Sequence, residues 1–207
     1  GTVAPLYLLA RESLPPQAAW VSATLWPLAP AANLFHPLSD VAYPLLSATA
    51  LAAAAWAARL KAAPERPGRT RWAALAVASG AVMGLGMMFT LALLPVGLSV
   101  ALVVLATQGL SLARGLSVIA AIGAGFLGIV GACWLASGVD PLATWGANLA
   151  NNTQFNEGTR RSYVAWLVYN PIETAIAAAL PAFAWAMVGV TAGRRLVPRA
   201  AWCTIAV

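Results

Sequence analysis

The chain has 207 residues, of which 61% are hydrophobic and only 9% are charged, and its mean hydropathy is +0.78. An ordinary soluble domain carries roughly 25% charged residues, so this composition excludes a typical water-soluble enzyme. The formal net charge of +6 comes from Lys and Arg clusters between apolar runs, which favours membrane topology over nucleic-acid binding. The sequence therefore predicts a single all-α integral membrane domain over residues 1–207, with membrane lipids rather than nucleic acid as partners.

The two ends of the chain lie inside apolar runs. Residues 1–10 and 200–207 are rich in Ala, Val and Leu but are too short to cross a bilayer by themselves. We therefore expect partial membrane spans at both ends, and we expect the chain to be a fragment of a longer protein.

Six stretches are long and apolar enough to cross the hydrocarbon core, which needs about 20 residues of helix. The run from residue 72 to 113 is too long for one crossing, and Pro95 favours a turn near Leu94 because proline breaks a helix interior. The expected fold is a polytopic transmembrane helix bundle with six complete spans. These spans are residues 17–35, 41–60, 72–93, 95–113, 115–138 and 171–192.

The basic residues divide unequally between the two sides of this arrangement. Arg160 and Arg161 fall on one side, and ten basic residues fall on the other: Arg11, Arg59, Lys61, Arg66, Arg69, Arg71, Arg114, Arg194, Arg195 and Arg199. Since Lys and Arg accumulate in cytoplasmic loops, the loop 61–71 is predicted to be cytoplasmic. Loops 36–40 and 139–170 are predicted to face the periplasm or exterior of an inner or plasma membrane.

Small residues at helical spacing predict where helices approach one another closely in lipid. Two such motifs are present, Gly80-x-x-x-Gly84 and Ala124-x-x-x-Gly128-x-x-x-Ala132. We interpret both as helix-packing motifs rather than as ligand sites.

The first outer loop places His36 and Asp40 between prolines at the membrane surface. Asp40 either caps the helix that begins at Val41, since Asp accepts hydrogen bonds from exposed N–H groups, or acts as a general base. In the second outer loop, Arg160 and Arg161 are suited to bidentate binding of a phosphate. The alternative is that these arginines pair with Glu157 or bind ordinary lipid headgroups.

Three segments resemble bacterial membrane glycosyltransferases of the GT-C superfamily. They are Phe35-His-Pro-Leu-Ser-Asp-Val-Ala-Tyr, Phe89-Thr-Leu in the Gly-rich span, and Arg161-Ser-Tyr-Val-Ala-Trp-Leu-Val-Tyr-Asn-Pro-Ile-Glu. The resemblance implies transfer of a sugar from a polyprenyl-phosphate donor to an acceptor on the outer face. It offers Asp40 as the catalytic base, or as a supporting polar residue if the family's usual base precedes Gly1. It also implies substrate binding by His36, Tyr43, Glu157, Arg160 and Arg161.

The resemblance implies no protein-bound cofactor, because the lipid-linked sugar is itself a substrate. The residues show no metal-binding set, and a need for a divalent metal stays open. Two other classes of function also stay open, a multispanning transporter or permease and a non-catalytic membrane subunit. The predicted spans hold almost no ionisable residues at mid-membrane, where transport pathways commonly place them, and this favours the enzyme over the transporter.

Overall fold

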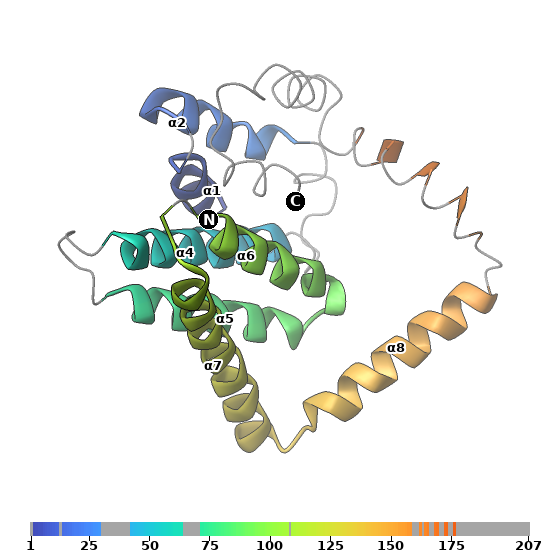
Figure 1. Ribbon diagram of the computed structural model, residues 1–207. Coiled ribbons are helices and arrows are strands. Elements are labelled where there is room, and N and C mark those ends of the chain that lie inside the picture. The colour runs from blue at the N-terminus through green and yellow to red at the C-terminus, as the bar shows by residue number, and fades with distance from the viewer. Residues whose placement is uncertain are drawn as a thin grey trace.

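The computed structural model describes residues 2–12, 14–29, 42–63, 71–107 and 109–158, with positions 162, 164–165, 168–169, 172–173 and 176 beyond them. Every regular element within these residues is a helix, as the sequence predicted (Figure 1). The long helices are α4 (Tyr43–Ala62), α5 (Trp72–Met87), α6 (Leu94–Ala106), α7 (Leu112–Ser137) and α8 (Pro141–Gly158). Shorter elements are α1 (Val3–Ala10), α2 (Pro16–Thr24), η1 (Trp26–Leu28) and η4 (Leu91–Leu93).

Helix α4 forms the centre of the core. Its buried side chains are mostly alanines, whose small size lets α1, α5, α6 and α7 all pack against it. Ser79 of α5 is fully buried, and its hydroxyl donates a 2.8 Å hydrogen bond to the carbonyl oxygen of Ala50. The α4–α5 contact thus satisfies a polar group that would be costly to leave unpaired in an apolar interior.

Helix α7 crosses α5, and the two backbones approach each other closely at glycines (Figure 1). A Cβ at Gly80 would overlap the carbonyl oxygen of Ile122, and one at Gly84 would lie 2.9 Å from the carbonyl oxygen of Phe126. From the other side, a Cβ at Gly125 would overlap the carbonyl oxygen of Val77. The predicted packing role of the Gly80 motif is therefore confirmed.

The second packing motif was predicted in the wrong register. Ala124, Gly128 and Ala132 are exposed, and a Cβ at Gly128 would meet nothing within 4 Å. Gly125, one position further along, is the small residue that meets α5. The error has a simple cause: small-residue spacing marks a possible contact face, and only the partner helix decides which of two adjacent faces is used.

The turn between α5 and α6 falls close to the predicted place, but Pro95 has a different role. Helix α5 ends at Met87, the hydroxyl of Thr90 accepts a 3.1 Å hydrogen bond from the backbone N–H of Ala92, and α6 begins at Leu94. Pro95 therefore lies in the first turn of α6, where its missing N–H costs nothing. It starts a helix instead of breaking one.

The predicted span 17–35 is wrong over its described part. Helix α2 ends at Thr24 after nine residues, a rise of only about 13 Å, and Trp26-Pro27-Leu28 continues as a 3-10 turn. Proline in this short segment cannot donate to a continuing helical ladder. Residues 30–41 lie outside the described residues.

One described helix, α7, is long and apolar enough to cross a membrane. Only 22% of its most apolar stretch is buried, unlike the core helix of a water-soluble protein. Helices α5 and α6 match the places of predicted spans but have 16 and 13 residues, fewer than a full crossing requires. The span 171–192 lies almost entirely outside the described residues, so six complete spans stay a prediction.

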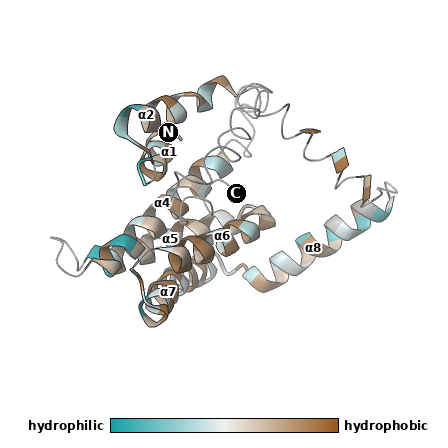
Figure 2. Ribbon diagram, turned by 45° about the horizontal axis from the view of Figure 1, so that its top comes forward, coloured by the Kyte–Doolittle hydropathy of each residue, from teal (hydrophilic) through white to brown (hydrophobic). Residues whose placement is uncertain are grey.

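Figure 2 shows hydrophobic residues along α5, α6 and α7 and hydrophilic residues at the end of α4. Several charged residues lie close together where α4 ends and where α5 and α7 begin. The carboxylate of Glu12, just after α1, pairs with Arg59 at 2.7 Å, and the Lys61 ammonium lies 3.8 Å from the ring centre of Trp72. Arg114, near the start of α7, donates to the carbonyl oxygen of Ala62 at 3.5 Å. We call this region the cationic end.

Candidate functional site

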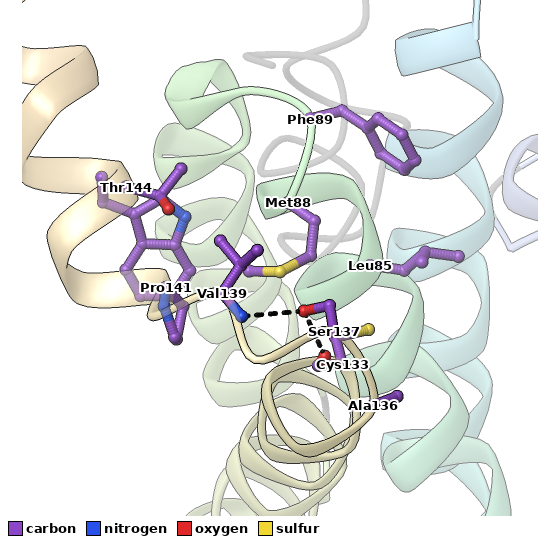
Figure 3. A pocket seen from close by; sticks show the side chains of 10 residues that line it. Leu85, Met88, Phe89, Cys133, Ala136, Ser137, Val139, Pro141 and Thr144 are labelled. Atoms are coloured by element: carbon purple, nitrogen blue, oxygen red, sulfur yellow. Dashed lines mark hydrogen bonds between the residues drawn. The ribbon is translucent and has the colours of Figure 1, made fainter.

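A pocket of about 450 Å³ lies at the ends of α5 and α7 (Figure 3). Both helices begin at the cationic end, so the pocket is at the other end of the bundle. It forms where the last turns of α5 and α7 meet the first turns of α8. Its walls are Leu85, Met88, Phe89, Cys133, Ala136, Ser137, Val139, Pro141, Thr144 and Trp145. Volume and lining are typical of a ligand pocket, which is usually roughly 300–1,000 Å³ and mostly apolar.

The connection from α7 to α8 is built from local hydrogen bonds. Gly138 ends α7 with a left-handed φ of 69°, a conformation that favours glycine because a Cβ would be strained there. The side-chain oxygen Oδ1 of Asp140 accepts hydrogen bonds from the N–H groups of Leu142 at 2.8 Å and Ala143 at 3.4 Å. Asp140 is thus the N-cap of α8, and Pro141 fills its first position.

Residues 139–170 were predicted to be an outer loop, and the structure forms a helix over the first part of that range; its position on the outer side stays a prediction. Helix α8 extends from Pro141 to Gly158 and leads away from the bundle (Figure 1). The signal was readable in Asp140-Pro141, a capping residue followed by proline at the first helical position. The many Asn residues that follow concealed it, because Asn has a low intrinsic helix propensity.

The side chain of Trp145 holds the start of α8 against α5 and α7. Its indole N–H donates a 2.9 Å hydrogen bond to the carbonyl oxygen of Met87, which is the last residue of α5 and has no acceptor role left within its own helix. The ring also lies 6.4 Å from that of Phe126 in a tilted arrangement. From Gly146 onward the described side chains of α8 are exposed, so α8 is held at its N-terminal end.

Replacing Trp145 with Phe is expected to lower the free energy of unfolding by about 1 kcal/mol, the net value of one hydrogen bond. SDS titration of the protein in mixed micelles would measure the change. Trp134→Phe is the control, since Trp134 is half exposed on α7 and outside the pocket. Equal losses in both variants would contradict the role given to the Trp145 N–H.

None of the described residues that line the pocket carries a charged side chain. The Ser137 hydroxyl donates to the carbonyl oxygen of Cys133 at 2.7 Å, and the Thr144 hydroxyl donates to that of Asp140 at 2.8 Å. The hydroxyl hydrogens of Ser137 and Thr144 and the indole hydrogen of Trp145 therefore already have hydrogen-bond partners within the protein. Within the described residues, no group of three or more His, Cys, Asp or Glu could hold a metal ion. The pocket can bind an apolar group but supplies no acid–base pair.

The candidate site residues predicted from the sequence lie elsewhere. Tyr43 is half-buried in the first turn of α4, and Glu157 is exposed near the far end of α8. Both ribbon views show that end of α8 apart from α4 (Figures 1 and 2). His36, Asp40, Arg160 and Arg161 lie outside the described residues, so their roles stay predictions.

The structure places on one helix, α8, several polar residues that the sequence interpretation had assigned to an outer loop. Asn148, Asn151, Gln154 and Glu157 recur at every third position and are all exposed. We call these four residues the polar row. Residues three apart are neighbours on a helix surface, but each step of three turns by about 60°. The row therefore winds about half-way around α8 and offers its amide and carboxylate groups on successive faces. Amides both donate and accept hydrogen bonds, and the carboxylate accepts them.

Known protein families, curated proteins and solved structures give no match to this chain.

Proposed function

We propose that this chain is part of a multi-pass membrane glycosyltransferase that takes its sugar from a polyprenyl-phosphate donor on the outer face of an inner or plasma membrane. The observation that carries the proposal is the position of the polar row. It projects from the end of the bundle opposite the cationic end, and the cationic end is the cytoplasmic one by the distribution of Lys and Arg. Sugar hydroxyls would therefore meet amides and a carboxylate on the side where lipid-linked donors are used.

Each part of the proposed site has its own role, and the two ends of α8 differ in theirs. Its anchored end, at Trp145, fixes its direction, while its exposed end offers hydrogen-bonding groups to hydroxyls of donor or acceptor. Transfer also needs a base to take the proton of the acceptor hydroxyl, and Asp40 is the proposed base. Arg160 and Arg161 follow α8 closely in the sequence, and their charges suit the phosphate of the leaving lipid. His36 and Tyr43 are proposed to contact substrate near Asp40.

Sidedness can be tested by labelling single cysteines in intact cells. In a background with Cys133→Ser and Cys203→Ser, we expect Gln154→Cys on α8 to react with a membrane-impermeant maleimide. Ala63→Cys, at the cationic end, should react only after permeabilisation. Labelling of both positions from the same side would contradict the proposed membrane placement.

Activity can be tested with the protein in vesicles, by following transfer of radiolabelled sugar from a panel of polyprenyl-phosphate sugars. Glu157→Gln is expected to raise KM roughly tenfold, the effect of losing one charge-assisted hydrogen bond. Glu12→Gln makes the same substitution at the cationic end, where it removes only the partly exposed ion pair with Arg59, and its KM should stay unchanged. Absence of transfer from every donor would instead favour a transporter or a non-catalytic subunit.

A further inference from the structure

The pocket beneath α8 has no place in the sugar-transfer chemistry above. All ten lining residues are uncharged, and the hydroxyl and indole hydrogens of Ser137, Thr144 and Trp145 already have partners in the protein. Ordered water in a cavity needs two to four polar partners. The pocket is therefore poorly suited to water, to a sugar and to a phosphate alike.

The surface around the pocket is as apolar as its interior. Phe89 is 67% exposed, and Leu135 is 89% exposed. Val139 and Leu142, on either side of the cap residue Asp140, are also exposed. Large exposed apolar surface marks a region that another apolar phase covers, and α7, the membrane-length helix that supplies part of the pocket wall, also exposes Leu127, Trp134 and Leu135.

We propose that this pocket holds one acyl chain of a bilayer phospholipid, wedged between the ends of α5 and α7 and the first turns of α8. An acyl chain fits because the pocket selects for hydrocarbon and offers nothing to recognise a headgroup. Phospholipid is the hydrocarbon source that surrounds any membrane helix. The acyl chain would fill a void whose lining otherwise lacks packing partners. It would also pack against the first turns of α8 and so help to hold the helix that carries the polar row.

This proposal depends on the proposed membrane placement but not on sugar transfer. The test uses the protein in vesicles that contain a phospholipid with a photoactivatable diazirine on its acyl chain, followed by mapping of the adducts by mass spectrometry. We expect adducts on the peptides that carry residues 85–89 and 133–137. Polyprenyl phosphate added without any sugar should not displace them, and displacement would assign the pocket to the isoprenoid chain and overturn the proposal.

Two neighbouring positions on α7 give a matched pair of variants. Cys133 lines the pocket, whereas Ala132 is exposed and does not line it. Cys133→Trp should lower the pocket adducts roughly tenfold, because close packing leaves no room for both an indole and an acyl chain, while Ala132→Trp should leave them unchanged. Thr144→Phe fills the pocket from the α8 side, and it provides the same test if Cys133→Trp does not fold.

The possible failures can be told apart. Adducts on the exposed Leu127 and Leu135 without any pocket adducts would show only ordinary surrounding lipid and would overturn the pocket assignment. Pocket adducts that do not decrease when the pocket is filled would overturn it as well. A protein without adducts either in the pocket or on the exposed face of α7 would contradict the membrane placement itself. Pocket adducts in a protein that transfers no sugar would support the lipid site and contradict the proposed enzyme activity.

Discussion

Gly80→Val and Gly125→Val are each expected to disrupt the packing of α5 against α7 and to abolish the folded helix pair. At both positions the first side-chain carbon would overlap a backbone carbonyl oxygen of the facing helix. A flexible side chain can move away from such an overlap, but here the backbones of two packed helices would have to separate. Forced overpacking typically costs roughly 1–3 kcal/mol, occasionally more.

The chain supplies a matched control for this prediction. Gly128 lies in the same helix as Gly125, and a Cβ there would meet nothing within 4 Å. Gly128→Ala should be neutral, or stabilise the protein by up to about 1 kcal/mol through its better helix propensity. Yield of monodisperse protein and SDS-induced unfolding would measure both effects. A folded Gly125→Val variant beside a destabilised Gly128→Ala variant would place α5 on the other face of α7.

Asp40→Asn is expected to lower sugar transfer by roughly 10²–10⁴-fold, the usual contribution of a general base. The substitution separates the two interpretations of this residue. Asn is as good an N-cap as Asp, so it preserves any capping of the helix that starts nearby, but an amide cannot accept the acceptor's proton. Transfer kinetics in vesicles, at matched expression, would measure the loss.

Asp140→Asn is the control for the Asp40 variant. Asp140 caps α8 through Oδ1, a role that the amide oxygen of Asn can keep, so this variant should retain its activity. Full activity of Asp40→Asn would exclude Asp40 as the base and move that role to another residue. The predicted cap of a helix starting at Val41 does not match α4, which begins at Tyr43 with Ala42 as its N-cap residue and no side-chain cap hydrogen bond. Equal losses at both positions would point to a shared effect on the outer end of the protein.

The helices were predicted correctly where the local sequence alone marks both the apolar run and its ends. The span 115–138 agrees closely with α7, because Ser111 and Gly138 cap an unbroken apolar run. The span 41–60 agrees with α4 to within two residues at each end. The span 17–35, which failed, and helix α8, which was not predicted, both depend on how a proline is used, and proline starts a helix as readily as it stops one.

The sequence by itself determined that the chain is helical, that Lys and Arg gather toward one end, and that α7 has the length and apolarity of a membrane helix. These properties depend on composition and on neighbours within a few turns, so they can be read along the chain. Only the tertiary structure decided that Gly125 rather than Gly128 meets α5, that α8 is anchored by Trp145, and that an apolar pocket forms beneath it. These features arise where segments far apart in the chain come into contact, as in the hydrogen bond between Trp145 and Met87, 58 positions apart. Local sequence patterns do not encode which faces of two helices will meet.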